Sequence, residues 1–335
     1  MIKVGIVGAS GYTGLELIKM LLNHPLFELV YLATSNGEEK IEDIYPALRG
    51  VFHYDLEKSD PLIVASRCDL VFLALPHKTS MSFAKELLDK NVKVVDLSAD
   101  YRLELETYEE HYCPHEDKEH LESSVYGLVE YYREEIKQSS LVAGPGCYPT
   151  ATLLGILPFI PYLDSSIPLF VDAKSGVSGA GKKLSDSTHF VNINDNIFAY
   201  NPLKHRHAPE IREKIKKIHG VDMEVNFVPH LIPATRGELV SVYGVLKEDI
   251  EPLEILKAYY KDEPFIRICQ EPVSIKNVSG THFCDVYAQK NNKSLFVNAS
   301  IDNLLRGASS QALACANLMC GFDEGLGIPK ISYVP

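Results

Sequence analysis

Met1-Ile2-Lys3-Val4-Gly5-Ile6-Val7-Gly8-Ala9-Ser10-Gly11-Tyr12-Thr13-Gly14 opens the chain and decides the fold of its first half. The mostly apolar run at 2–7 is typical of a buried parallel strand, and a glycine-rich turn follows it. Apolar residues then recur at helical spacing between Leu15 and Leu22. We therefore predict a strand–turn–helix unit, which is the context required of a dinucleotide-binding turn.

Strand and helix patterns alternate after this unit. Strands are predicted at 27–33, 70–74 and 92–97, with a helix at 80–89, which favours an α/β Rossmann-type domain with a doubly wound sheet. Longer strands predominate later, and they are predicted at 169–173, 221–227, 237–246, 274–278, 283–289 and 294–299. This second part is predicted to be an α+β catalytic domain with an open mixed sheet.

The length of 335 residues suggests two domains. We predict a dinucleotide-binding domain at 1–147 and a catalytic, substrate-binding and oligomerisation domain at 148–307. An apolar helix at 307–320 is expected to pack back on the first domain, so 308–335 would complete that domain.

The composition excludes several classes of partner. Lys+Arg 33 against Asp+Glu 45 gives a net charge of -12, which disfavours binding to nucleic acid or to an anionic membrane. The chain starts directly with a strand pattern, and no apolar stretch reaches transmembrane length, so we expect a cytoplasmic protein. The seven cysteines show no disulfide or paired zinc spacing, which fits reduced thiols in that compartment.

One cysteine has the surroundings of a reactive thiol. Cys147 lies in Gly144-Pro145-Gly146-Cys147-Tyr148-Pro149-Thr150, directly before an apolar run at 151–157 that reads as a helix. Gly146 permits a tight turn and Pro149 suits the first helical turn, so Cys147 is expected at a helix N-terminus. The helix dipole and unpaired N–H groups there favour the thiolate, which is the nucleophilic form. The alternative is a small buried residue in a turn.

The glycine-rich turn at 8–14 predicts a nucleotide site. Its glycines let the main chain approach a pyrophosphate, and the next helix offers its N–H groups. An NAD site would place an acidic residue about twenty positions later, whereas this region reads Ala33-Thr34-Ser35-Asn36-Gly37, with the first carboxylate at Glu38. Hydroxyl groups would accept a 2′-phosphate that an acid would repel, so we predict NADP. Lys40 would help to neutralise it or would simply be solvated.

Further polar segments supply candidate acid/base and anion-binding groups. Lys204-His205-Arg206-His207-Ala208-Pro209-Glu210-Ile211 places two imidazoles and a guanidinium beside a predicted helix at 209–218. The segment 174–182 is a Gly/Ser loop that could present N–H groups to a phosphate or nicotinamide, and Arg102 follows a predicted strand and could bind an anionic substrate. The cluster of His111, Cys113, His115 and His120 offers no closed ligand set, so no metal is predicted.

Taken in order, these segments resemble the N-acetyl-gamma-glutamyl-phosphate reductase family, in the aspartate-semialdehyde dehydrogenase-like superfamily. The resemblance spans essentially the whole chain and rests on eight ordered motifs: 8–14, 75–77, 96–102, 144–150, 174–181, 205–211, 229–237 and 302–308. The chain departs from the family pattern at Val129, where proline is usual, and at Ser310, where glycine is common. Neither departure removes a reacting group.

The resemblance implies roles for individual residues. The cysteine matching Cys147 would be the nucleophile, and an imidazole of the His-Arg-His segment the acid/base; spacing from the cysteine favours His205, with His207 as the alternative. The NADP site would comprise Gly8, Ser10, Gly11, Tyr12, Thr13, Gly14, Ser35, Pro76, Ser175, Gly176 and Asn303, the last near the nicotinamide. Arg102, Arg206 and His207 would bind substrate.

The expected activity is NADPH-dependent reduction of N-acetyl-L-glutamyl 5-phosphate to the 5-semialdehyde through a cysteine thioester, a step of arginine biosynthesis. Two alternatives remain: a reductase of another acyl phosphate, aspartyl or carrier-linked aminoadipyl, and an NADP-sensing protein without catalysis. A homodimer or homotetramer is expected from the resemblance.

Overall fold

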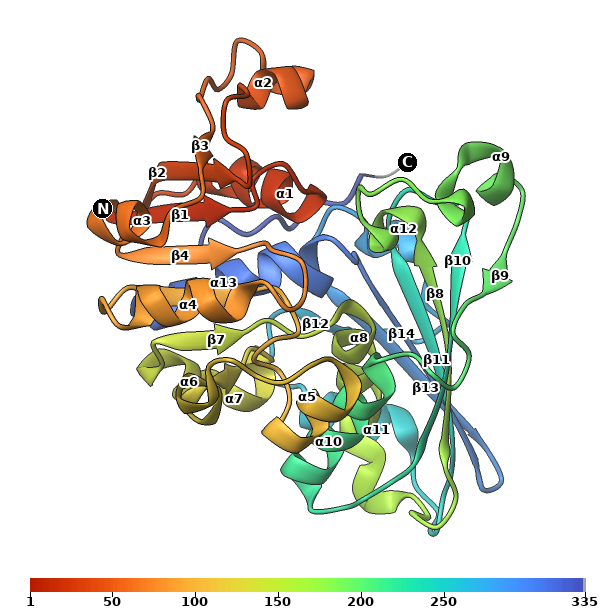
Figure 1. Cartoon of the computed structure of the whole chain (residues 1–335). Coiled ribbons are helices and arrows are strands. Elements are labelled where there is room, and N and C mark those ends of the chain that lie inside the picture. The colour runs from red at the N-terminus through yellow and green to blue at the C-terminus, as the bar shows by residue number, and fades with distance from the viewer. Residues whose placement is uncertain (334–335) are drawn as a thin grey trace. The chain divides into compact units, whose positions relative to one another are not determined.

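The computed structural model describes residues 1–333 and divides into two compact units (Figure 1). Unit 1 comprises Met1–Pro145 and Ala308–Ile328, and unit 2 comprises Gly146–Gly307 together with the described residues 329–333. Two details differ from the predicted domain limits of 1–147 with 308–335. Gly146 and Cys147 belong to unit 2, and so does the segment 329–333.

Hydrogen bonds explain why the segment 329–333 leaves the first domain. The His282 N–H donates to the Pro329 carbonyl at 3.1 Å, and the Tyr333 N–H donates to the Ser279 carbonyl at 3.0 Å. These bonds tie the end of the described chain to residues of unit 2. Residues 334 and 335, which the prediction also assigned to the first domain, lie outside the described residues.

Unit 1 is built on a parallel sheet. Its described strands follow the order β3-β2-β1-β4-β5-β7-β6, and every neighbouring pair is parallel. The strands are β1 (Ile2–Val7), β2 (Phe27–Thr34), β3 (Glu57–Lys58), β4 (Leu70–Leu73), β5 (Lys93–Asp96), β6 (Val125–Tyr126) and β7 (Leu141–Ala143). From β1 the chain first builds the sheet outward through β2 and β3 and then continues on the other side of β1 with β4 and β5. Ligands of such parallel sheets bind at this point of reversal. The predicted Rossmann-type fold class is confirmed.

Helices cover both faces of this sheet. They are α1 (Tyr12–Leu21), α2 (Ile41–Ile44), α3 (Pro61–Arg67), α4 (Ser80–Leu88), α5 (Leu105–His111), α6 (Lys118–Ser123), α7 (Val129–Gln138) and α13 (Ser310–Met319), with short helical turns η1 (Pro46–Leu48) before β3 and η5 (Leu305–Ser309) before α13. Helix α13 comes from the far end of the chain and packs on α7, α1 and β5. Its ten residues are all buried, which explains its small and apolar sequence.

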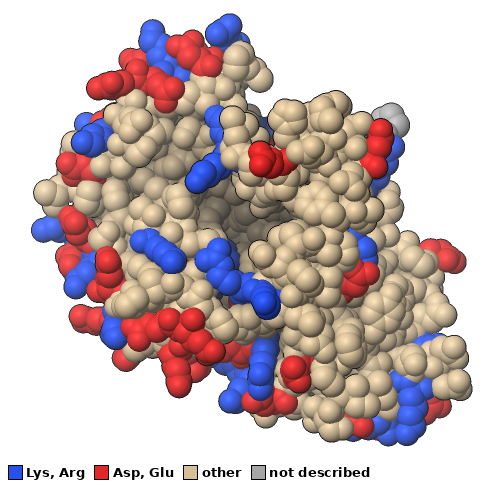
Figure 2. All heavy atoms as spheres, turned by 45° about the vertical axis from the view of Figure 1, so that its right-hand side comes forward, with Lys and Arg blue, Asp and Glu red and all other residues tan. Residues whose placement is uncertain are grey.

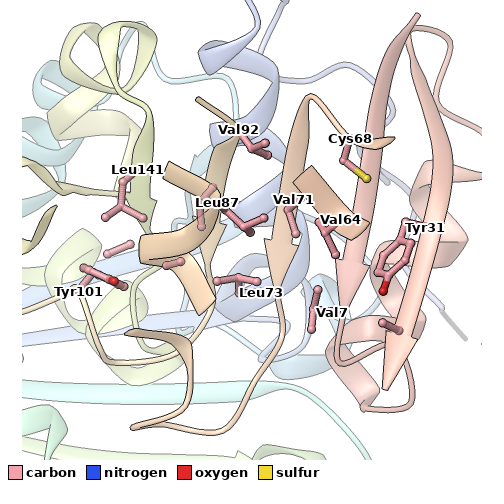
Figure 3. Packing of buried hydrophobic residues seen from close by; sticks show 14 of the residues in the cluster. Val7, Tyr31, Val64, Cys68, Val71, Leu73, Leu87, Val92, Tyr101 and Leu141 are labelled. Atoms are coloured by element: carbon pink, nitrogen blue, oxygen red, sulfur yellow. The ribbon is translucent and has the colours of Figure 1, made fainter. Parts of the chain in front are cut away.

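The core of unit 1 forms where α3 and α4 meet the sheet (Figure 3). Val71 and Leu73 of β4 face Val64 of α3 and Leu87 of α4, and all four side chains are fully buried. Leu70 and Phe72 are the other two residues of β4, and their side chains point to the opposite face of the sheet. They are equally buried, so that face is covered too. Each such aliphatic side chain contributes about 1.5–3 kcal/mol when buried.

Unit 2 contains a mixed sheet in the order β12-β13-β14-β11-β8-β10-β9. Its described strands are β8 (Leu169–Gly176), β9 (Phe198–Ala199), β10 (Val225–Ile232), β11 (Glu238–Val245), β12 (Ile266–Ile268), β13 (Cys284–Asn291) and β14 (Ser294–Ile301). The pairs β8·β10 and β12·β13 are parallel, and the other described pairs are antiparallel. The expected α+β unit with an open mixed sheet is confirmed.

The main helices of unit 2 lie on one side of its sheet (Figure 1). The helical segments are α8 (Cys147–Ile156), η2 (Leu157–Tyr162), η3 (Val177–Ala180), η4 (Asp186–Thr188), α9 (Phe190–Ile193), α10 (His207–His219), α11 (Pro252–Tyr259) and α12 (Ile275–Val278). Helix α8 packs on β11, β13 and β14, while α10 packs on α8 and β10. The first helical turn of α8 is thereby fixed by elements on several sides.

Two sequence predictions in this unit need correction. The strand expected at 221–227 begins only at Val225 and continues to Ile232, because β10 pairs with β8 through its polar residues and Pro229 as well. The strand expected at 274–278 is the short helix α12, in which the Ser279 N–H donates to the Ile275 carbonyl at 3.0 Å. Gly280, with a φ of 86°, follows this helix in the left-handed region that favours glycine.

The charged side chains are distributed in small groups of both signs on the face shown in Figure 2. Among the described residues, no helix is long and apolar enough to span a bilayer.

Candidate active site

The glycine-rich turn between β1 and α1 is shaped by steric limits at two glycines. Gly8 has a φ of 94°, and a side chain there would overlap the Ala74 carbonyl oxygen. A Cβ at Gly14 would lie 2.6 Å from the Gly8 carbonyl oxygen, so only glycine lets α1 approach the turn this closely. Gly11 differs, because the nearest atom to its Cβ position is 3.5 Å away. A side chain at Gly11 would therefore make only ordinary van der Waals contacts.

This turn fits a nucleotide pyrophosphate. The first N–H groups of α1 have no partners within the helix, and its first turn carries no acidic residue. The Tyr45 hydroxyl donates to the carbonyls of Ser10 and Gly11 at 2.7 and 3.0 Å, so both oxygens are bonded within the protein. Tyr12 and Thr13 supply the half-exposed start of the helix.

The other predicted cofactor residues of unit 1 follow strands that neighbour β1. Ser35 is exposed just after β2, and Pro76 is exposed a few residues beyond the end of β4. The main chain after β2 turns sharply, with the Gly37 N–H donating to the Thr34 hydroxyl at 3.1 Å. The first carboxylate, Glu38, therefore comes only after the turn. Hydroxyl and amide groups at this strand end suit a ribose 2′-phosphate better than a free 2′-hydroxyl.

Arg102 is buried and bonded to main-chain carbonyls. Its Nε donates to the Gly144 carbonyl at 2.6 Å, and one terminal nitrogen donates to the Leu97 carbonyl at 2.9 Å. These bonds fix the segment that leads from β7 toward Cys147. Binding of a substrate anion by Arg102 stays a prediction.

Cys147 is the first residue of α8 and is half-buried. The preceding Gly146 has a φ of -64° and a ψ of 153°, so the chain enters the helix directly from an extended conformation. The Gly146 N–H donates to the carboxylate of the buried Glu210 at 2.9 Å, and this bond explains why Gly146 belongs to unit 2. A Cβ at Gly307 would lie 2.6 Å from the Cβ of Cys147, so the thiol is packed on that side as well.

The structure places His207, rather than His205, against the segment that holds the thiol. A Cβ at Gly146 would lie only 2.6 Å from the Nε2 atom of His207. His205 instead accepts a hydrogen bond from the His207 N–H through its Nδ1 at 3.2 Å, and its ring contacts Tyr200 and Phe227. Burial, followed by the charge of Arg206, lowers the pKa of His205 to about 4. Such an imidazole is poorly matched to proton transfer near neutral pH.

A buried carboxyl group that the sequence analysis missed faces the thiol. Glu238 begins β11, is fully buried, and contacts the Cys147 side chain. The alternation of side chains along β11 could have indicated that Glu238 is buried. Glu238, Val240 and Val242 lie on the same face of the strand, and all three are buried. Glu210 was quoted in the sequence motif but not assigned a role; its bond to Gly146 shows one.

Two tyrosines lie near Cys147 and Glu238. The Tyr200 hydroxyl donates to the Tyr148 hydroxyl at 3.2 Å, and the Tyr148 hydroxyl donates to the His230 carbonyl at 3.2 Å. Burial raises the pKa of both phenols, so both are neutral. The ring of Tyr148 also contacts the ring of His207, with centroids 5.8 Å apart. The polar groups nearest Cys147 are therefore held in fixed orientations.

The predicted cofactor residues of unit 2 form one cluster. Asn303 Nδ2 donates to the Ser178 hydroxyl at 3.0 Å, while its Oδ1 accepts from the Gly237 N–H at 2.8 Å. Ser175 is buried beneath the same loop, and a Cβ at Gly176 would lie 2.8 Å from the main chain of Arg236. Ser175, Gly176 and Asn303 are thus brought together, with the start of η3 between them.

Arg206, predicted to bind substrate, is exposed and immediately precedes α10. Within residues 1–333, no group of three or more His, Cys, Asp or Glu side chains is arranged to hold a metal ion. His115 and His120 instead bond to the Asp100 carbonyl and the Asp117 carboxylate.

Comparisons with known protein families match both units. Residues 3–139 match the semialdehyde dehydrogenase NAD binding domain, and residues 147–303 match the semialdehyde dehydrogenase dimerisation domain. Among solved structures, aspartate semialdehyde dehydrogenase II from Vibrio cholerae, complexed with ASA, has a TM-score of 0.72 at 15% identity, covering 96% of this chain and 98% of that chain. The NADP complex of aspartate semialdehyde dehydrogenase from Candida albicans has a TM-score of 0.69 at 16% identity, with the same coverages. These likenesses show the fold.

Curated relatives are much closer in sequence. The chain is 72% identical to the N-acetyl-gamma-glutamyl-phosphate reductase of a Sulfurovum species, over 100% of both chains. It is 61% identical to the protein of the same name from Wolinella succinogenes, over 100% of this chain and 99% of that protein. The resemblance inferred from the ordered motifs is confirmed, and the alternative acyl-phosphate reductases and the NADP sensor are not favoured. The chain belongs to the N-acetyl-gamma-glutamyl-phosphate reductase family.

Proposed function

We propose that this protein reduces N-acetyl-L-glutamyl 5-phosphate to N-acetyl-L-glutamate 5-semialdehyde with NADPH and releases phosphate, as a step of arginine biosynthesis. One structural observation carries the proposal: a half-buried thiol begins a buried helix, with an imidazole packed against the preceding glycine. The names of the relatives at 72% and 61% identity support the choice of acyl group.

The Cys147 thiolate starts the reaction by attacking the acyl carbon of the phosphate anhydride. The bond to phosphate then breaks, phosphate leaves with the electron pair, and a thioester to Cys147 remains. N–H groups at the start of α8, which have no partner within the helix, would stabilise the oxyanion that develops on the acyl carbon. NADPH, when bound, supplies the hydride that reduces the thioester carbon. Glycines of the turn at 8–14, with Ser35 and Pro76, would hold its nucleotide part, and Ser175, Gly176 and Asn303 its nicotinamide part.

His207 is proposed as the acid/base. Its ring lies against Gly146, whereas His205 is engaged with the start of α10 and has a lowered pKa. After reduction, His207 would protonate the oxyanion of the thiohemiacetal. It would then accept that proton again as the carbon–sulfur bond breaks, which releases the aldehyde and restores the thiolate. The structure therefore supports the histidine that the sequence analysis kept as its alternative.

The second unit contains a dimerisation domain and the molecule is accordingly expected to self-associate. We propose that it forms a homodimer through the face of its sheet that lies away from α8, α10 and α11. Phe170 of β8 and Tyr243 of β11 are about half exposed there, at 52% and 47%. These two residues pair across adjacent strands and form an apolar patch that a second copy could cover.

The activity is tested most simply in reverse. Purified protein supplied with the N-acetylated semialdehyde, phosphate and NADP⁺ is expected to produce NADPH, measured by its absorbance. Omission of phosphate should stop the reaction, because phosphate must attack the thioester. The aspartyl and aminoadipyl semialdehydes serve as matched substrates, and faster turnover of either would overturn the proposed acyl specificity.

Cys147→Ala tests the covalent route. This variant lacks the nucleophile and should lose turnover completely, while NADP⁺ binding, measured by calorimetric titration, remains within about threefold of the parent because the glycine turn is unaltered. Phosphate-dependent turnover by Cys147→Ala would contradict the thioester mechanism.

A further inference from the structure

Glu238 is a buried carboxyl group placed against the reacting sulfur. It is 0% exposed and begins β11, on which the Cys147 helix α8 packs. Among residues 1–333, neither of its carboxyl oxygens has a hydrogen-bond donor at normal geometry. The Cys147 thiol is a polar side chain in contact with this carboxyl group. A polar group left in this position costs stability, so it requires a functional explanation.

Among the described residues, no cationic side chain bonds to the carboxyl oxygens of Glu238. Asp302, also fully buried, acts on Glu238 through its charge and accepts hydrogen bonds from Arg236, Gly280 and Leu304. Tyr148 and Tyr200 approach from α8 and from the segment after β9, and both are neutral phenols. Burial, opposed by the contact with Cys147 and reinforced by the charge of Asp302, raises the pKa of Glu238 to about 8.

We propose that Glu238 is a positioning residue that holds the Cys147 sulfur through a hydrogen bond donated by its carboxylic acid group. This inference rests on the proposed function, because it concerns the same thiol. A carboxylic acid kept neutral by its surroundings can donate a hydrogen bond to a developing anion.

Cys147 and Glu238 then share one proton. In one form the sulfur carries the proton and the carboxylate is charged; in the other the sulfur is a thiolate and the carboxyl group is neutral. The N-terminus of α8 stabilises negative charge on the sulfur, whereas the surroundings of Glu238 disfavour charge on the carboxylate. The reacting form in this proposal is therefore the thiolate, with the acid proton directed at it. When the thioester forms, the sulfur loses its charge, and when the thiohemiacetal collapses, the returning charge meets the same donor.

Alkylation of Cys147 by iodoacetamide tests this without substrate or NADP. The rate is measured from pH 5 to 10 for the parent, Glu238→Ala and Glu238→Gln, with Cys147→Ala as background. Glu238→Ala removes the donor and should react about tenfold or more slowly at pH 7, with its profile displaced to higher pH. Glu238→Gln keeps a neutral donor of the same size and should stay within about threefold of the parent.

Ser300→Ala is the matched control, because it removes a hydroxyl that donates to the main-chain carbonyl of Glu238 and leaves the carboxyl group in place. It should alkylate like the parent. Two results would overturn the inference: a rate for Glu238→Ala equal to that of the parent, or an equal loss in Glu238→Gln and Glu238→Ala while both remain folded by thermal unfolding.

Turnover in the reverse assay is recorded for the same proteins. Glu238→Ala should lower kcat with little change in the KM for the semialdehyde, since the residue acts on the sulfur. If the parent shows the expected alkylation pattern but no phosphate-dependent turnover, the proposed function fails while the role of Glu238 in the thiol's reactivity stands.

Discussion

His205 and His207 are only two residues apart, yet their surroundings give them different chemistry. The imidazole of His205 accepts from the main chain at the start of α10 and is surrounded by aromatic rings, so it is held neutral. The imidazole of His207 is packed on Gly146, one residue before the thiol. The first arrangement orders the helix start, and the second places an imidazole beside the residue that precedes the proposed nucleophile.

Substitution of each histidine by asparagine separates these roles. His207→Asn should lower kcat about 10²-fold or more and remove the acid/base limb of the pH–rate profile, because proton transfer would fall to water. His205→Asn should lower the melting temperature while changing kcat much less. Steady-state kinetics across pH, with thermal unfolding of both variants, makes the comparison. A larger kcat loss in His205→Asn would restore the assignment made from spacing.

Glu238 should give folding stability an unusual dependence on pH. Its pKa is raised on folding from 4.5 to about 8, so the folded state binds more protons than the unfolded state between these values. Its contribution to the free energy of unfolding is therefore fully present below about pH 4.5 and is lost as the pH rises through 8, by at most about 1.4 kcal/mol per pH unit. Urea unfolding at a series of pH values should show a flatter decline for Glu238→Gln than for the parent. If the free energy of unfolding falls equally with pH in Glu238→Gln and in the parent, Glu238 is not a buried neutral acid.

At the scale of elements, the turn between β1 and α1 illustrates why three glycines of one motif are not equivalent. Gly14 has no room for a side chain, because its Cβ position is 2.6 Å from one main-chain oxygen and 2.8 Å from the Ala9 Cα. Gly11 has ordinary contacts only, so the fold does not exclude a side chain there. We therefore expect Gly14 to serve packing and Gly11 to serve the proposed cofactor site.

The pair Gly11→Ala and Gly14→Ala tests this distinction. Gly11→Ala should fold with a melting temperature close to that of the parent but bind NADP⁺ about tenfold or more weakly, since the methyl group occupies the space before the helix N-terminus. Gly14→Ala should be destabilised by about 1–3 kcal/mol, because main-chain atoms must move. Thermal unfolding and titration with NADP⁺ measure both. Equal stability of the two variants would contradict the steric argument.

The elements predicted well from the sequence are those whose signal is local. The strand at 2–7, the glycine turn and the helix after Cys147 each combine an apolar run with glycine or proline at its boundary. The five residues at 274–278 carry apolar and β-branched residues typical of a strand, but hydrogen bonds with Ser279 close them into α12. The contact of Glu238 with Cys147 joins residues 91 positions apart. Such a contact depends on how β11 and α8 pack, and this packing cannot be predicted from the local pattern of a single sequence.

At the scale of the whole molecule, the sheet of unit 2 leaves one face for association. The helices α8, α10 and α11 lie on the other face, and Cys147 begins α8 (Figure 1). Tyr243 stacks obliquely on Phe296 of β14, with ring centroids 5.4 Å apart, which extends the patch begun by Phe170. Self-association on this face would stiffen the strands that carry Glu238 and Ser175 without covering Cys147 from that side of the sheet.

Phe170→Asp tests where the copies meet. A carboxylate placed in the centre of the patch would have to be desolvated on association, so light scattering after gel filtration should show a smaller assembly than the parent, tending to the monomer mass of 37.4 kDa on dilution. Leu62→Asp is the matched control, because Leu62 of α3 is an exposed apolar residue of unit 1, and this variant should keep the parent's mass. If Phe170→Asp also keeps it, association must use another surface. If its mass falls and turnover falls with it, we infer that the arrangement of β8 and β11 around the thiol depends on the second copy.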